Sequence, residues 1–226
     1  KKKFKNYTPT KKEIKLSNKF IIENNDDFVV VNKPPGLAVQ SGTKSLKNIV
    51  DILRKNKVFD NSTPFLVHRI DKETTGVLIV AKNRKSAQLF TSLFRLRKIH
   101  KTYMAIVIGE LDKKSGEFID TLFHYEGTNK IMTKAITRYN VIDSKNNYSL
   151  LRLNPLTGRK HQLRKQLFIR GHPVFGDTKY KFHNSKVKKK QNLMLHAYEI
   201  YFSINDVRYN FSADLPLYFK NFLIEK

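Results

Sequence analysis

Short apolar runs bounded by turn-forming residues set the pattern of the first half of the chain. The run at 28–32 (FVVVN) predicts a buried strand, and the Lys-Pro-Pro-Gly sequence after it forces an extended or turning backbone. Pro64 interrupts the chain before the apolar residues 65–67, and residues 76–81 and 103–108 predict further strands. Apolar residues at helical spacing predict helices over 45–57 and after Asn83, whose side chain can serve as the N-cap.

The second half is richer in strand-like patterns. Strands are predicted at 118–122, 131–141 and 148–153, and helices at 160–169 and 215–224. Alternating apolar residues at 198–202 and 207–211 flank Asn205-Asp206, which predicts a β-hairpin. Because helices and strands do not alternate regularly, we predict an α+β fold with a mixed, largely antiparallel sheet and flanking helices. We expect residues 1–20 to form a mobile basic arm or linker and residues 21–226 to form one domain.

The charge of the chain is strongly basic and unevenly distributed. The 226 residues include 44 Lys and Arg against 19 Asp and Glu, which gives a net charge of +25. The excess lies in four blocks, at 1–20, 82–101, 152–170 and 179–190. Such blocks favour a surface that binds nucleic acid. A lysine-rich compositional bias is the plainer alternative, and an anionic membrane is disfavoured because no block is a clean amphipathic helix.

The absence of cysteine excludes disulfides, cysteine-ligated zinc and a thiol nucleophile. The sequence also lacks a His pair spaced for zinc on a helix, a glycine-rich phosphate-binding loop and the glycine motif of dinucleotide-binding domains. We therefore predict no zinc site, and the sequence does not indicate bound ATP or NAD.

The densest polar stretch outside the basic blocks is 68–76, between two apolar runs. Its Asp71 lies next to Arg69 and Lys72, and neighbouring cations favour an ionised carboxylate at neutral pH. Such a carboxylate can act as a nucleophile or as a base. A salt bridge within a turn explains the same residues equally well, so the local sequence leaves both interpretations open.

A second candidate segment runs from Thr157 to Arg164. A Thr-Gly pair before a predicted helix offers backbone N–H groups and the positive end of a helix dipole to an anion. Arg159 and Arg164 are spaced so that one can face a phosphate while the other points inward. Taken alone, a capped surface helix with solvated cations explains this segment better. Tyr103, on the predicted strand 103–108, is by itself more typical of a core or rim position than of a catalytic one.

Five motifs, in order along the chain, carry a resemblance to a known enzyme family. They are Asn32-Lys33-Pro34-Pro35-Gly36, the stretch from His68 to Leu78, Lys101-Thr102-Tyr103 with Gly109, the stretch from Thr157 to Arg164 followed by Gly171-His172-Pro173 and Gly176-Asp177, and Leu195-His196-Ala197. Together they resemble the RluA family of pseudouridine synthases, and most closely its RluC-like branch, which acts on large-subunit ribosomal RNA. The resemblance covers residues 20–220 and implies the pseudouridine synthase fold.

The resemblance implies a role for each matching residue. Asp71 matches the catalytic aspartate, and Arg69 matches the arginine that fills the gap left by a flipped uridine. Tyr103 matches the active-site tyrosine. Arg164 matches the arginine that pairs with the aspartate, with Arg159 as the second choice. The enzymes of the family need no metal or organic cofactor. For RNA binding we expect Lys33, Arg159, Lys160, His161, Lys188, Lys189 and Lys190.

The resemblance implies isomerisation of specific uridines in 23S-type ribosomal RNA to pseudouridine. Two alternatives stay open: a pseudouridine synthase for transfer RNA, and a non-catalytic RNA-binding factor of ribosome assembly. We expect a monomer in the cytoplasm with no membrane partner, and an S4-type RNA-binding domain upstream of this chain. The chain departs from the family's motifs at Thr75 and at Lys165-Gln166. Thr75 keeps the hydroxyl of the usual Ser, whereas Gln166 replaces a His and puts substrate contacts near its helix in doubt.

Overall fold

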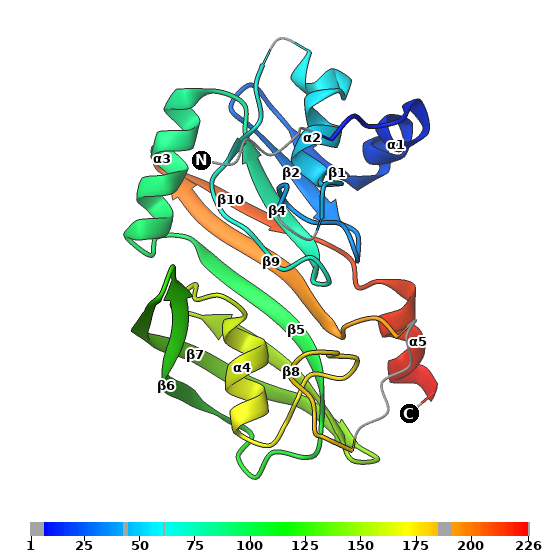
Figure 1. The fold of residues 1–226 in the computed structure, drawn as a ribbon, viewed down its shortest axis with the longest axis vertical. Coiled ribbons are helices and arrows are strands. Elements are labelled where there is room, and N and C mark those ends of the chain that lie inside the picture. Colours follow the sequence, from blue (N-terminus) through cyan, green and yellow to red (C-terminus); the bar gives the residue numbers. More distant parts are fainter. Residues whose placement is uncertain (1–6, 43–44, 61, 185–190, 226) are drawn as a thin grey trace. The chain divides into compact units, whose positions relative to one another are not determined.

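The computed structural model describes residues 7–42, 45–60, 62–184 and 191–225. The chain divides into two compact units. The first consists of Lys1–Ile99 with Glu199–Asp214, and the second of His100–Tyr198 with Leu215–Lys226. Each unit combines antiparallel strand pairs with helices (Figure 1). Each unit also has its own apolar core. The α+β class predicted from the sequence is therefore confirmed.

The sheet of the first unit is built around strand β4. The elements of this unit are α1 (Lys11–Ser17), η1 (Asn18–Phe20), β1 (Ile21–Asn24), β2 (Phe28–Lys33), α2 (Ile49–Arg54), η2 (Lys57–Phe59), β3 (Phe65–Leu66), β4 (Thr75–Ala81), α3 (Arg84–Arg95), the second part of β9 (Leu195–Ile204) and β10 (Val207–Ser212). Strands β2 and β3 both pair antiparallel with β4, β1 pairs with β2, and β10 pairs with β9. Every residue of β4 is buried, which is why its sequence is a continuous apolar run instead of an alternating one.

Aromatic packing joins α3 to this sheet. Asn83 caps the helix as predicted, since its side chain accepts a hydrogen bond from the backbone N–H of Ser86 at 2.8 Å. On the buried face, the ring of Phe90 meets Phe28 of β2 and Phe202 of β9 edge to face, with 5.3 Å between centroids in each pair. This cluster fixes the rotation of α3, so its polar face is held toward solvent.

Residues 1–20, which we expect to form a mobile basic arm or linker, contain α1 and η1 in the part that the structure describes. A capping box starts α1: the N–H of Glu13 donates to the hydroxyl of Thr10, and the N–H of Thr10 donates to the carboxylate of Glu13. The side chain of Asn56 then donates to the hydroxyl of Ser17 at 2.7 Å. Capping and one buried amide thus order a segment whose composition is basic.

The second unit is a sheet of long strands with α4 and α5. Its elements are β5 (His100–Ile108), β6 (Ser115–Glu126), β7 (Asn129–Lys145), β8 (Tyr148–Pro155), α4 (Gln162–Ile169), the first part of β9 and α5 (Leu217–Glu225). Strand β8 pairs antiparallel with β5 and β7, and β7 pairs with β6. The β6–β7 hairpin extends well beyond the predicted strands 118–122 and 131–141. Much of it is exposed, so its apolar residues mark only part of its length.

The hairpin of β9 and β10 is confirmed. Asn205 and Asp206 both have positive φ values, 48° and 64°, as a type I′ turn requires. Ile204 and Val207 form the first pair of the ladder. Two short polar residues that tolerate this conformation therefore set the register of both strands.

Candidate functional site

Asp71 lies on a short loop that is fixed at both ends in the first unit. The loop joins β3 to β4, which pair with each other, and Ile70 within it is buried. Nε2 of His68 accepts a hydrogen bond from the backbone N–H of Ile79 at 2.9 Å, and the N–H of Thr74 donates to the carbonyl of Asp71 at 3.2 Å. The Asp71 residue remains half-exposed. The predicted catalytic carboxylate is therefore presented on a rigid support.

Lys33 supports this loop from inside the unit. Its side chain is buried, and Nζ donates hydrogen bonds to the backbone carbonyls of Pro34, Leu37 and Lys72 at 2.8, 2.9 and 2.9 Å. The third carbonyl belongs to the residue after Asp71, so Lys33 ties the Lys-Pro-Pro-Gly turn to the loop. Burial lowers the pKa of Lys33 to about 7, although two nearby carboxylates oppose part of that shift.

We predict that Lys33 gives the stability of the protein a distinctive pH dependence. The pKa of this lysine is 10.5 in the unfolded chain and about 7 in the folded protein, so the unfolded chain binds more protons between these pH values. The cost of burying the ammonium is therefore full below pH 7 and disappears as the pH rises to 10.5. Denaturant unfolding at about pH 7 and about pH 10 should show the wild type gaining stability relative to Lys33→Met at the higher pH.

Lys55→Met is the matched control for this pH dependence, because Lys55 is exposed. The stability difference between this variant and the wild type should stay the same at both pH values. If Lys33→Met and Lys55→Met changed in parallel, the buried ammonium would not be the cause.

Tyr103 lies in the second unit, in β5, opposite Leu153 of β8. Its side chain is half-buried and packs against the apolar core of that unit. Burial lowers the pKa of Lys101, two residues earlier. The Nζ atom of Lys101 lies beside Gly158, 3.9 Å from where a Cβ atom would be. Two of the predicted motifs, far apart in sequence, are therefore neighbours in this unit.

The segment that begins at Thr157 forms a closed turn. The Thr157 hydroxyl accepts a hydrogen bond from the backbone N–H of Ile136 at 2.9 Å and donates to the side-chain oxygen of Gln162 at 2.7 Å. The same oxygen accepts from the backbone N–H of Arg159 at 3.0 Å. Helix α4 starts later than predicted, because His161 before it has a left-handed φ of 54°. The side chains of Thr157 and Gln162 therefore form hydrogen bonds with backbone groups near the start of α4, where the sequence suggests an anion-binding site.

Arg164 and Asp177 form a buried ion pair in the same unit. The guanidinium donates from Nε to Oδ2 at 2.6 Å and from Nη2 to Oδ1 at 2.8 Å, and both side chains are buried. Asp177 Oδ1 also accepts hydrogen bonds from the backbone N–H groups of Lys179 and Tyr180 at 2.8 and 2.9 Å. One carboxylate therefore fixes both the plane of the guanidinium and the turn that follows it.

The sequence motifs assign no role to Asp177 or Tyr180. The hydroxyl of Tyr180 lies 3.0 Å from Nδ1 of His161, and its ring centroid lies 5.3 Å from the guanidinium carbon of Arg164. An ion pair between residues 13 apart has no local signature. In the sequence, Asp177 is marked as part of the Gly176-Asp177 pair that ends the fourth motif.

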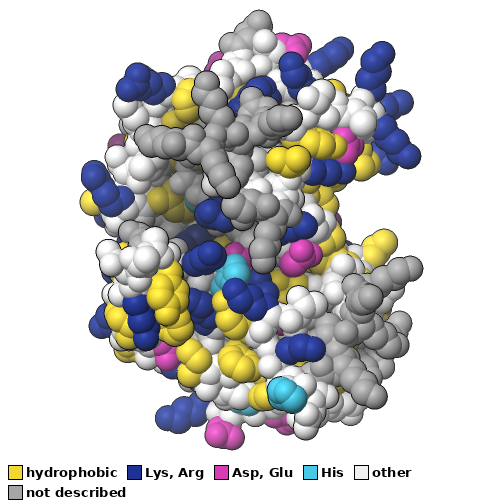
Figure 2. All heavy atoms as spheres, in the orientation of Figure 1, with side chains coloured by type: hydrophobic (Ala, Val, Ile, Leu, Met, Phe, Trp, Pro, Cys, Tyr) yellow, Lys and Arg dark blue, Asp and Glu magenta, His cyan; other side chains and the backbone are white. Residues whose placement is uncertain are grey.

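The predicted RNA-binding residues differ in their surroundings. Arg159 and Lys160 are exposed, whereas His161 is half-buried beside Tyr180. Lys33 was expected to bind RNA, but its buried ammonium is bonded to three carbonyls, so it supports the Asp71 loop instead. Lys188, Lys189 and Lys190 lie outside the described residues. Figure 2 shows one face of the molecule, on which Lys and Arg side chains are widespread and Asp and Glu side chains are few.

Gln166, where the family's motif has His, lies in an internal polar network. Its side-chain oxygen accepts a hydrogen bond from the Thr137 hydroxyl, and its amide donates to the carboxylate of Asp120, both at 2.7 Å. Asp120 in turn forms an ion pair with Arg170 at 2.8 Å. Because Gln166 is buried, this departure from the family's motif bears on the packing of α4 and not on the surface of the unit.

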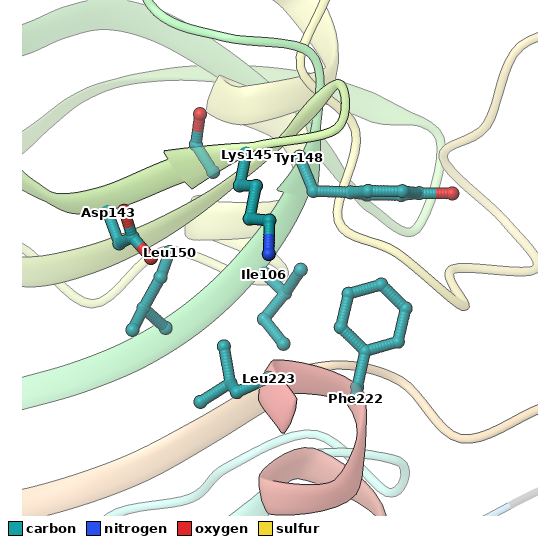
Figure 3. Close-up of a pocket in the computed structure, with 8 residues that line it drawn as sticks. Ile106, Asp143, Lys145, Tyr148, Leu150, Phe222 and Leu223 are labelled. Carbon is teal, nitrogen blue, oxygen red and sulfur yellow. The ribbon is translucent and has the colours of Figure 1, made fainter. Parts of the chain in front are cut away.

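A small hollow in the second unit contains none of the predicted site residues. It lies between the β7–β8 turn and α5, where Lys145, Tyr148 and Phe222 line it (Figure 3). Its volume of about 40 Å³ holds a few waters but no nucleotide. In the described part of the chain, no three side chains of the His, Cys, Asp and Glu types gather as a metal site requires. No helix within those same residues is long and apolar enough to cross a membrane.

Comparison with known proteins finds relatives along most of the chain. The family model described as RNA pseudouridylate synthase matches residues 27–168. A Rickettsia bellii protein called ribosomal large subunit pseudouridine synthase C is 36% identical over 91% of this chain and 71% of its own length. A Haemophilus ducreyi protein called tRNA pseudouridine synthase C is 31% identical over 81% of this chain and 84% of its own length. The solved structure of human RNA pseudouridylate synthase domain containing 4 is 27% identical, with a TM-score of 0.80 over 93% of this chain and 94% of that one.

The matched segment bears directly on the candidate site. Residues 27–168 include Arg69, Asp71, Tyr103 and Arg164, so the motifs that carry these residues lie within the part of the chain that the family model describes. The similarity is not limited to the fold, because relatives above 30% sequence identity align along most of the chain. The chain therefore belongs to the RNA pseudouridylate synthase family, as its motifs predict, and is an isomerase that acts on RNA.

Proposed function

We propose that this pseudouridine synthase isomerises specific uridines of large-subunit ribosomal RNA, with Asp71 as the catalytic carboxylate. The observation that carries the proposal is the presentation of Asp71. The residue is half-exposed, lies between the exposed cations Arg69 and Lys72, and stands on a loop that Lys33 and the β3–β4 pairing hold in place. The name and the 91% coverage of the Rickettsia bellii relative support ribosomal RNA as the substrate.

The reaction needs no oxidant, reductant or external energy source. The bond between C1′ of the ribose and N1 of uracil breaks, the base rotates, and a bond forms between C1′ and C5. The C5 proton leaves to solvent and N1 gains a proton, so the product is an isomer of uridine. An ionised Asp71 can attack C1′, or it can remove the C2′ proton to give a glycal, and both routes are open.

We assign supporting roles to three further residues. Arg164, whose plane is fixed by Asp177, takes the role of the arginine that the family's motif pairs with the catalytic aspartate. Arg69, which is exposed next to Asp71, fills the gap that the flipped base leaves. Tyr103 contacts the extruded base, for which an aromatic ring is a suitable surface. Removing a base from the stack is costly, so these contacts offset that cost.

Mapping of pseudouridine at single-base resolution tests the substrate. The protein is incubated separately with unmodified large-subunit ribosomal RNA and with transfer RNA transcripts. We expect pseudouridine at defined uridines of the ribosomal RNA and none in transfer RNA. Product in transfer RNA alone would favour the second candidate, a transfer RNA pseudouridine synthase, which the name of the Haemophilus ducreyi relative supports.

We also propose that the protein works as a monomer in the cytoplasm. One chain carries Arg69, Asp71, Tyr103 and Arg164, so no second copy is needed to supply any of them. The proposed ribosomal RNA substrate supports the location. Light scattering after size exclusion should give the mass of one chain, and a dimer would contradict the proposal.

A further inference from the structure

The C-terminal turn of α3 carries a dense group of cations. Arg95, Arg97 and Lys98 are all exposed, and Leu96 between them exposes 62% of its surface. The sequence has no acidic residue over 74–109. Within the described part of the chain, none of these three cations forms an ion pair with a carboxylate. Their mutual repulsion is therefore not relieved by a neighbouring acid.

Arg97 also has a backbone conformation that arginine rarely adopts. The N–H of Lys98 donates to the carbonyl of Leu93 at 2.9 Å, and the N–H of Arg97 donates to that of Phe94 at 3.2 Å, the usual pattern of a helix C-cap. Arg97 has a φ of 57° in this turn, at the position that glycine most often takes because it lacks a Cβ. The chain thus keeps an exposed cation where a glycine would be less strained.

Aromatic packing links this turn to the Asp71 loop within the first unit. The ring of Phe94, in the last turn of α3, lies against the ring of His68, with 4.7 Å between their centroids. His68 begins the loop that carries Asp71, and its Nε2 is bonded to the backbone of β4. The turn that carries the three cations therefore directly follows a residue that packs against the start of this loop.

We propose that the turn at 95–98 binds the backbone phosphates of the RNA strand beside the target uridine. Exposed arginine and lysine without carboxylate partners are the side chains that bind phosphate, and arginine can do so with two parallel hydrogen bonds. A flipped nucleotide loses its stacking, so a rigid contact to the adjacent backbone helps to hold it in place. The assignment rests on the proposed function, because it requires an RNA strand at the Asp71 loop.

The helix dipole alone does not explain this cluster. Cations near a helix C-terminus are stabilising, which accounts for Arg95 and Lys98. Arg97 is different, because a glycine at the same place would make the same C-cap hydrogen bonds without the strain. Replacing Arg97 therefore separates an RNA contact from a structural role.

Arg97→Gly should bind RNA more weakly without loss of stability. Its melting temperature should stay the same or rise by about 2–4 °C, because the strained side chain is gone. Its affinity for a labelled fragment of large-subunit ribosomal RNA, measured by fluorescence anisotropy at low salt, should fall about 3- to 10-fold. The slope of log affinity against log salt should decrease by about 1 in magnitude. Arg97→Asn, which tolerates the left-handed conformation but carries no charge, should change the slope equally.

Two matched variants provide controls. Asn205→Gly relieves another left-handed residue of the same unit without a change in charge, and Lys55→Gln removes an exposed cation beside α2. Both should keep the wild-type salt slope. The proposal would be overturned by an unchanged slope in Arg97→Gly, by an equal loss of slope in Lys55→Gln, or by a lower melting temperature of Arg97→Gly. Pseudouridine formation by the wild type is measured separately. If the salt slope of RNA binding depends on Arg97 but no pseudouridine forms, the proposed reaction is refuted, whereas the proposal that the turn at 95–98 binds RNA stands.

Discussion

Asp71→Asn is expected to lose about 10³-fold or more in the rate of pseudouridine formation. The amide is neutral, so it can neither attack C1′ of the ribose nor take the proton from C2′. Asparagine has nearly the same size as aspartate and keeps the backbone carbonyl that accepts from Thr74, so the variant should fold, and its melting temperature checks this. Single-turnover rates with saturating enzyme measure the chemical step, and anisotropy on the same RNA measures binding, which should persist.

Glu73→Gln is the matched control for this variant. Glu73 is an exposed carboxylate on the same loop, so its replacement removes the same charge two residues away. Its single-turnover rate should stay within about threefold of the wild type. Equal losses in the two variants would point to the charge of the loop instead of to Asp71. A fully active Asp71→Asn would remove Asp71 from the mechanism.

Asp177→Asn is expected to reduce both stability and activity. Breaking a buried ion pair by removing one of its charges is strongly destabilising, and we expect a loss of about 3–5 kcal/mol of the free energy of unfolding. The asparagine oxygen can still accept from the backbone N–H groups of Lys179 and Tyr180, so the turn itself should persist. Arg164 loses its fixed plane, and we therefore expect the single-turnover rate to fall more than RNA affinity. Urea unfolding and the single-turnover assay measure the two effects.

A double variant separates the structural effect of this ion pair from its catalytic effect. Arg164→Met alone leaves the Asp177 carboxylate buried without a cation, so it too should be destabilised. Adding Asp177→Asn removes the second charge while its side-chain oxygen can still accept from the backbone N–H groups of Lys179 and Tyr180, so it should recover part of the free energy of unfolding. The double variant should stay inactive, since no guanidinium remains. Recovered activity would exclude Arg164 from the reaction.

Sequence patterns predicted the elements whose structure depends on local signals. The continuous apolar runs form β2 and β4, the Asn83 cap starts α3, and the Asn205-Asp206 pair makes the β9–β10 turn. Strand β1 and the full length of the β6–β7 hairpin were missed, because partly exposed strands do not produce continuous apolar runs. Helix α1 was missed because its basic composition is also typical of an extended arm, although Thr10 and Glu13 form a capping box.

The candidate site depends on contacts that no motif reveals. The motifs located Asp71, Tyr103 and Arg164, and the family model covers all three. They did not reveal that Lys33 is buried, since its partner carbonyl at Lys72 is 39 residues away. The motifs likewise did not reveal that Arg164 forms a buried ion pair with Asp177. A charged residue in a sequence suggests exposure, and only the tertiary structure shows which charges are instead internal.

Release of tritium from RNA labelled at C5 of uridine tests the central claim most directly. Each turnover replaces the C5–H bond with a bond to C1′ and so sends the C5 hydrogen to water. We predict release from large-subunit ribosomal RNA with the wild type and only background release with Asp71→Asn. A folded wild type that binds this RNA but releases no tritium would contradict the proposed reaction on ribosomal RNA. Release by Asp71→Asn at the wild-type rate would contradict the assignment of Asp71.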